Sequence, residues 1–377
     1  MKTVRKLLGV LLAVLLISAL ALNPVTASAA DAYEPVAGTT TDFTKYLVVP
    51  NDANIPAATF SFTVEPGAAV AAGEGTLAVL AGLDADKVVI EDTTFTAGQD
   101  TTAGAAEDGI VNTTEKKYAQ NTVTVDLTQV RFPEPGVYRY IITESASDDP
   151  FVNDATATRT LDVYVGDDNG ALAIEGYVMY SGTLTTGPSA DAATADGKSA
   201  KFVNEVETAN LTFSKTVEGN QGARDKFFLF TLTIENAGAG TIVNVTVDGT
   251  TPTKTAATIY EAAVMTGEDG NGVTTLTADA EGKIVHNFYL SHGDSVTVTG
   301  VPKTATYALT EVKEDYENTP PTNASGSFAD GNATVAFTNT REGVIPTGVA
   351  MTLVPGAAIL LIAAAALVIL NRKKSKA

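Results

Sequence analysis

Six polar residues stand out because their chemical types could form a covalent bond. A lysine, a glutamate and an asparagine occur twice in the same order, each two or four residues after an aromatic side chain: Lys45, Glu144 and Asn204, then Lys215, Glu311 and Asn339. A neutral lysine amine is a nucleophile, and an asparagine carboxamide is an electrophile with a poor leaving group. A glutamate beside them could carry protons so that ammonia departs. The product would be a Lys–Asn isopeptide bond in each half of the chain.

This chemistry needs a protein core, and the local patterns predict one. Alternate residues of a strand share a face. Lys45 is in phase with Phe43 and Leu47, Asn204 is in phase with Phe202, and the other four polar residues likewise follow apolar neighbours. Burial disfavours both charges, which favours a neutral amine beside a neutral acid. The alternative is an ordinary buried Lys–Glu pair near an asparagine, but its ordered repetition favours the bond.

The elements that must position these groups are strands. The chain between its two ends is rich in Thr, Val, Tyr and Phe, in short alternating runs between turn clusters such as residues 167–170. This pattern predicts an all-β fold of β-sandwiches. The repeated motif predicts two tandem domains, at residues 31–206 and 207–342.

The two ends of the chain predict export and membrane retention. Residues 1–30 combine Lys2, Arg5 and Lys6 with an apolar run and small residues, as in a cleaved signal peptide; a retained membrane anchor is the alternative. Residues 349–370 are long and apolar enough for a transmembrane helix, and a basic tail follows. We therefore expect the last part of the chain, residues 343–377, to hold the protein at the membrane.

Composition excludes several classes of function. Without the two ends, the chain carries 17 basic and 44 acidic residues, a formal charge of −27, which argues against nucleic acid as a partner. It has no cysteine, and hence no disulfide, thioester or thiolate metal site. His286 and His292 are the only histidines, and His286 is expected to be a core or edge residue rather than a metal ligand. We expect no metal site, no cofactor and no catalytic triad.

The chain resembles the T-antigen type of sortase-assembled streptococcal backbone pilin. The resemblance runs through residues 211–215, 293–296, 307–311, 337–339 and 345–348. It implies two immunoglobulin-like domains placed end to end, each with a self-formed Lys–Asn bond assisted by a glutamate. Carried over by motif, the bonds would join Lys45 to Asn204 with Glu144, and Lys215 to Asn339 with Glu311.

The same resemblance implies handles for assembly. Ile345-Pro346-Thr347-Gly348 precedes the apolar segment, where a sortase would cut between Thr347 and Gly348. The commonest sorting pattern is Leu-Pro-x-Thr-Gly, from which this sequence departs, and Val344 replaces the polar residue of the pilin variant. Lys198 is the best match to the lysine that links subunits, and Lys201 is the alternative. An extended proline linker and a solvated surface lysine are the alternative readings of these two features.

We therefore expect a structural pilus subunit of the cell surface, not an enzyme, whose own chemistry is self-crosslinking. Its partners would be sortase, identical subunits and peptidoglycan, with a host surface as an open candidate. A monomeric wall-anchored adhesin or stalk protein is the first rival, and a wall-bound hydrolase is the second. The hydrolase would need a catalytic cleft for which the sequence gives no residues.

Overall fold

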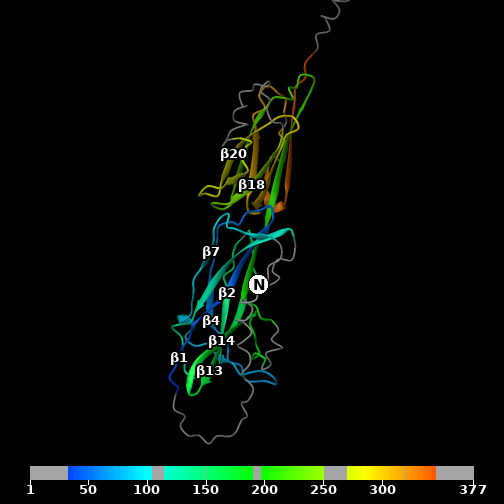
Figure 1. Cartoon of the computed structure of the whole chain (residues 1–377). Coiled ribbons are helices and arrows are strands. Elements are labelled where there is room, and N and C mark those ends of the chain that lie inside the picture. The colour runs from blue at the N-terminus through cyan, green and yellow to red at the C-terminus, as the bar shows by residue number, and fades with distance from the viewer. Residues whose placement is uncertain are drawn as a thin grey trace, which may run out of the picture.

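The structure is a computed structural model that describes residues 33–103, 114–148, 150–189, 197–249, 270–318 and 320–344. Its strands form two sets of sheets, one from residues up to Val206 and one from Thr208 onward. Figure 1 shows the two sets stacked end to end in an elongated body. The predicted signal peptide, transmembrane segment and sortase motif lie outside the described residues. Within the described part, no helix is long and apolar enough to cross a membrane.

The first set contains two main sheets. One has the order β14-β13-β11-β4, with β5 beside β11, and its strands are β4 (Phe62–Pro66), β5 (Leu80–Ala81), β11 (Gly136–Glu144), β13 (Thr158–Asp168) and β14 (Ala171–Ser181). The other has the order β12-β15-β2-β9-β6, with β8 beside β9, and comprises β2 (Thr40–Pro50), β6 (Val89–Ile90), β8 (Thr102–Ala103), β9 (Lys116–Asp126), β12 (Phe151–Val152) and β15 (Lys201–Val206).

Short elements complete this first set. Two small pairs are β1 (Val36–Ala37) with β10 (Arg131–Phe132), and β3 (Ala58–Phe60) with β7 (Thr93–Phe95). A short 3-10 turn, η1, covers Ala85–Lys87. The predicted turn at residues 167–170 joins β13 to β14, with Asn169 and Gly170 both at positive φ (55° and 89°). That geometry suits an Asn-Gly hairpin, because its twist matches the twist of the strands.

The second set also contains two sheets. One has the order β19-β18-β21-β16-β24, with β16 (Thr208–Glu218), β18 (Ile242–Asp248), β19 (Thr275–Thr277), β21 (Ser295–Pro302) and β24 (Ala333–Thr340). The other has the order β20-β17-β22-β23, with β17 (Phe228–Glu235), β20 (Ile284–Leu290), β22 (Thr306–Glu311) and β23 (Ser325–Ser327). A 3-10 turn, η3, covers Phe328–Asp330.

In each set the two main sheets share one hydrophobic core. Phe62 of one sheet packs against Phe43 and Phe202 of the other, edge to face or tilted, with ring centroids 5.0 and 5.3 Å apart. In the second set, Phe230 of one sheet packs on Phe337 of the other at 5.1 Å. Burying aromatic rings at this spacing holds two sheets face to face. The prediction of an all-β fold with tandem immunoglobulin-like sandwiches is confirmed.

A turn after β2 contacts the second set of sheets. The Asp52 carbonyl oxygen accepts hydrogen bonds from Asn244 Nδ2 and Thr299 Oγ1, both at 2.8 Å. Ala53 is fully buried against Gly300, where an added Cβ would lie 2.7 Å from the Ala53 Cα. Gly300 also has a φ of 76°, so this position requires glycine twice over. These contacts join the turn after β2 to the second set of sheets.

Candidate functional site

The first candidate site combines three elements of the first half. Lys45 lies in the middle of β2, and Asn204 lies in β15, which pairs with β2 in parallel. In this register Lys45 is opposite Phe202 and Asn204 is opposite Leu47, so the lysine and asparagine are offset by two positions and share a face. Glu144 reaches them from the end of β11 in the facing sheet. The sandwich thus brings together residues that lie 159 positions apart.

The distances within this first site are those of direct contact. Lys45 Nζ donates to Asn204 Oδ1 at 2.5 Å, and it lies 2.7 Å from Glu144 Oε1. The side chains of Lys45 and Glu144 are 0% and 3% exposed, and Asn204 is also fully buried. The Phe60 ring lies under the amine, with 4.2 Å between Nζ and the ring centroid. The amine, the carboxylate and the carboxamide are therefore in contact away from water.

The second candidate site repeats this construction. Lys215 lies in β16 and Asn339 in β24, again on parallel neighbouring strands, with Lys215 opposite Phe337. Glu311 ends β22 in the facing sheet. Lys215 Nζ lies 2.5 Å from Glu311 Oε1, and the same oxygen accepts a hydrogen bond from Asn339 Nδ2 at 2.8 Å. The ring of Phe228 lies 4.4 Å from the amine.

Burial sets the protonation tendencies of both sites. Loss of water lowers the pKa of the Lys45 amine to about 8, although Glu144 partly opposes the shift. Loss of water likewise raises the pKa of Glu144 and lowers the pKa of Lys215. Each shift favours an uncharged amine, which is the nucleophilic form, or an uncharged acid, which can donate a proton.

The two sites present the asparagine amide in opposite orientations. In the first site the carboxamide oxygen faces the amine, and Asn204 Nδ2 points toward Asn153 Oδ1 at 3.4 Å. In the second, the carboxamide nitrogen faces Glu311, while Asn339 Oδ1 is buried and has no hydrogen-bond partner within the described residues. In the second site, one carboxylate oxygen therefore contacts both the lysine amine and the asparagine amide nitrogen.

Sequence reasoning missed the polar residues that surround each site. In the first, Asp154 Oδ2 accepts from Val203 N and from Arg159, both at 2.8 Å, and Arg159 Nε donates to the Lys201 carbonyl at 2.7 Å. In the second, Asn318 Nδ2 donates to Glu311 Oε2 at 2.6 Å. These residues lie in loops or at a strand start, where no periodic pattern marks an inward side chain.

Of the residues predicted to act in assembly, the structure describes the two lysines but not the sortase motif. Lys198 is exposed in a short segment that pairs with β14, where Ser181 N donates to Gly197 O and Ser199 N donates to Met179 O, both at 2.9 Å. Lys201 is half-buried at the start of β15. The sortase motif, Ile345 to Gly348, lies outside the described residues. Gly343 just before it is held by Asn220 through two hydrogen bonds of 2.7 and 2.9 Å.

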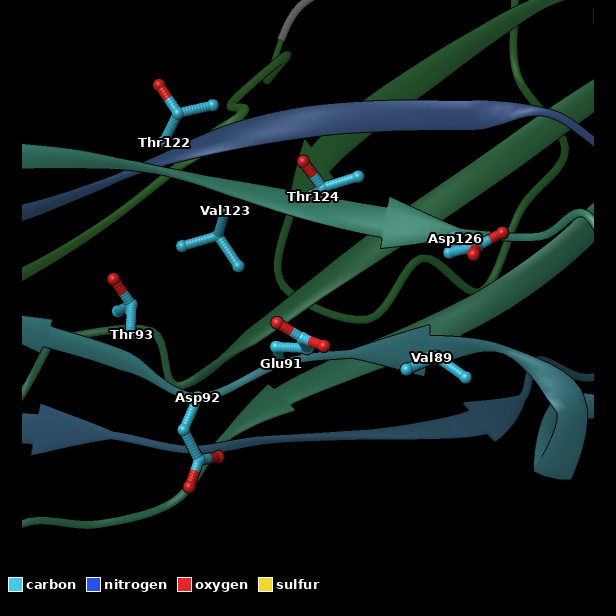
Figure 2. Close-up of a pocket in the computed structure, with 8 residues that line it drawn as sticks. All are labelled: Val89, Glu91, Asp92, Thr93, Thr122, Val123, Thr124 and Asp126. Carbon is cyan, nitrogen blue, oxygen red and sulfur yellow. The ribbon is translucent and has the colours of Figure 1, made fainter.

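A separate surface pocket of about 380 Å³ lies beside β9 and is lined by Val89, Glu91, Asp92, Thr93, Thr122, Val123, Thr124 and Asp126. Figure 2 shows Glu91 directed toward β9, whereas Asp92 points away from it. Three or more metal-ligating side chains do not cluster anywhere in the described part of the chain. His286 is buried, with Nε2 3.0 Å from the Gly270 carbonyl oxygen, as expected of a core residue.

Comparison with known proteins gives a match for each half. Residues 41–207 match the Spy0128-like isopeptide containing domain, and residues 209–341 match a domain of unknown function, DUF7601. A pilin of Streptococcus pyogenes serotype M1 is 27% identical over 290 residues, covering 71% of this chain and 76% of that protein. The chain is similar to the T-antigen-type streptococcal backbone pilins, and the predicted resemblance is confirmed.

Two further proteins are similar to parts or most of this chain. The pilus tip adhesin Cpa of Streptococcus pyogenes is 31% identical over 148 residues, which cover 37% of this chain and 18% of the adhesin. The crystal structure of the major pilin from Streptococcus pyogenes aligns with 82% of this chain and 100% of its own, at 24% identity and a TM-score of 0.47.

Proposed function

We propose that the protein is a backbone pilin, polymerised by sortase and anchored to the peptidoglycan of a Gram-positive cell wall. Each domain, at residues 31–206 and 207–342, would carry one self-formed Lys–Asn bond. The observation that carries this proposal is the pair of buried Lys–Glu–Asn sites, both built on parallel neighbouring strands with the glutamate opposite. The kinship with pilins supports it independently.

The reaction at each site is an amide exchange. The lysine ammonium first passes a proton to the glutamate carboxylate, which gives a neutral amine beside a neutral acid. Nζ then attacks the asparagine carboxamide carbon, and a new C–N bond forms. The glutamate gives its proton to Nδ2 and takes the second proton of Nζ, the bond to Nδ2 breaks, and ammonia leaves while the glutamate ends protonated. Holding the groups at contact distance makes the attack unimolecular, which compensates for the weak electrophile. The product is neutral, so the electrostatic cost of a buried ion pair disappears.

The crosslinks suit a polymer under tension. In the proposed pilus, force enters one subunit at Lys198 and leaves it at Thr347. It would run along residues 198–215 and then cross the Lys215–Asn339 bond to β24, so the interior of the second domain would carry little load. The first crosslink would pin β15, the strand that follows Lys198 in the chain. Covalent bonds at these points resist forces that would separate noncovalent strand pairs.

The polymer is tested by immunoblots of wall extracts from the bacterium that makes the protein. A ladder of high-mass species that depends on sortase is expected. Lys198→Arg should abolish the ladder, whereas Lys201→Arg, the matched control three residues away, should preserve it. A single anchored band would overturn the backbone role. That band would instead favour the anchored adhesin. The similarity of 148 residues to a pilus tip adhesin is the observation that supports this second candidate.

A further inference from the structure

One polar contact of the second site is not explained by the lysine, glutamate and asparagine alone. Asn318 lies in the loop after β22 and donates its Nδ2 hydrogen to Glu311 Oε2 at 2.6 Å. The loop is held beside the end of β24 by two backbone hydrogen bonds between Glu317 and Thr340, at 2.9 and 2.8 Å. Thr340 directly follows Asn339, so the backbone fixes the amides of Asn318 and Asn339 on the same carboxylate.

The contacts divide the two oxygens of this carboxylate between different tasks. Oε1 lies 2.5 Å from Lys215 Nζ and accepts from Asn339 Nδ2 at 2.8 Å, whereas Oε2 accepts from Asn318. The Asn318 Oδ1 atom is buried and accepts no hydrogen bond within the described residues. A buried amide oxygen without a partner costs stability. The side chain therefore gains its polar anchor from Glu311 rather than from the surrounding fold.

We propose that Asn318 is a positioning residue for bond formation at the second site, an inference that rests on the proposed isopeptide function. By occupying Oε2, the Asn318 amide fixes the rotation of the carboxylate and leaves Oε1 to carry the proton. Oε1 takes a proton from Lys215 Nζ, which frees the amine to attack, and passes it to Asn339 Nδ2 as ammonia leaves. Oε1 then takes the second Nζ proton, so Glu311 ends neutral and Asn318 is unchanged throughout.

The first site has no equivalent of this contact. Among the described residues, no side-chain amide donates a hydrogen bond to Glu144, and the neighbouring Asn153 instead faces the leaving amide of Asn204 at 3.4 Å. A substitution at Asn318 should therefore change the reaction of the second domain only. The crosslinking rate of the first domain in the same molecule then serves as an internal reference.

The test follows ammonia loss with time in the full chain, made by cell-free synthesis with a mild detergent. Mass spectrometry of joined peptides measures each crosslink separately. Asn318→Ala is expected to slow the second crosslink by roughly tenfold or more, because carboxylate orientation is lost, while the first crosslink keeps its rate. Asn323→Ala is the matched control, since Asn323 also donates one amide hydrogen, to Thr334 O on β24, without contacting Glu311.

A second variant separates positioning from a purely structural role. The carboxylate introduced by Asn318→Asp cannot donate a hydrogen bond while it is ionised, and it repels Glu311. Once this carboxylate is protonated, its O–H can donate to Glu311 Oε2. The second-site rate of Asn318→Asp, divided by the wild-type rate at the same pH, should therefore rise toward one as the pH falls. The corresponding ratio for Asn318→Ala should stay low at every pH, because alanine offers no donor.

The outcomes distinguish this inference from the function beneath it. Any of three results would overturn the positioning role and leave the crosslink intact. These are a second-site rate equal to the wild-type rate in both Asn318 variants, equal slowing by Asn323→Ala, and a relative rate of Asn318→Asp that does not change with pH. A wild-type second domain that never loses ammonia would overturn the isopeptide proposal and this inference together.

Discussion

Preventing the second crosslink should lower the thermal stability of the second domain by a large and calculable amount. A bond between Lys215 and Asn339 closes a loop of about 125 residues, and the chain-entropy relation gives it roughly 5 kcal/mol of stabilisation. For a domain of about 130 residues, 1 kcal/mol corresponds to about 3–4 °C in Tm. Loss of the bond alone should therefore lower the Tm of the second domain by about 15–20 °C.

The choice of variant decides whether this number is measured cleanly. Glu311→Ala prevents the bond but also leaves the Lys215 amine buried without its partner, which adds about 3–5 kcal/mol of destabilisation. The double variant Lys215→Met/Glu311→Leu also lacks the bond and leaves no buried charge. We expect the double variant to show the crosslink effect alone, and Glu311→Ala to unfold at a still lower temperature.

Scanning calorimetry of the full chain provides the assay, because the first domain serves as an unaltered reference in the same trace. Glu235→Ala is the control on the second domain, since Glu235 forms a half-exposed pair with Lys283 at 2.9 Å that contributes at most about 1 kcal/mol. If the double variant unfolds within a few degrees of the wild type, the covalent account of the second domain is wrong.

Three further outcomes follow from the same geometry. Because the pKa of the Lys45 amine is lowered to about 8, the neutral fraction of this amine grows with pH. In freshly synthesised chain the rate of the first crosslink should rise about tenfold per pH unit below pH 8 and level off above it. A time course of intact mass measures this rate. Arg139→Met should destabilise the first domain by about 3–5 kcal/mol in urea unfolding, because it leaves the fully buried Asp162 without the guanidinium that binds it at 2.7 Å. The control Lys87→Ala breaks an exposed pair with Asp84 and should cost less than about 1 kcal/mol. Asn244→Ala should increase hydrogen exchange at residues 51–54, because it removes the amide that donates to the Asp52 carbonyl across the junction between the two halves. Amide protection equal to that of the wild type would argue against a stiff junction.

The inward positions of the six reactive groups were predictable from the sequence, since strand alternation is a local property. Glu144 follows Tyr138, Tyr140 and Ile142 at intervals of two, and all four are buried. The Asn-Gly turn at residues 169–170 was predictable for the same reason, because its backbone conformation depends on those two residues.

The rest of the site depends on contacts between distant segments, which no local pattern encodes. Asn318 reaches Glu311 only because the loop pairs with Thr340, and nothing in its sequence neighbourhood marks it as inward-facing. Arg139 lies on the opposite face of β11 from Tyr138 and Tyr140, so alternation does not predict its burial. Its partner Asp162 and the carbonyls of Leu184 and Thr186 that it binds become visible only in the folded chain. The parallel pairing of β2 with β15 and of β16 with β24 is likewise a property of topology.

Tandem mass spectrometry of freshly purified wild-type protein tests the self-crosslinking account most directly. It should find two joined peptide pairs, Lys45 with Asn204 and Lys215 with Asn339, and an intact mass lower by two ammonia molecules than the sequence requires. Glu144→Ala and Glu311→Ala should each restore the mass of one. A wild-type chain of full mass that yields only linear peptides would contradict the account.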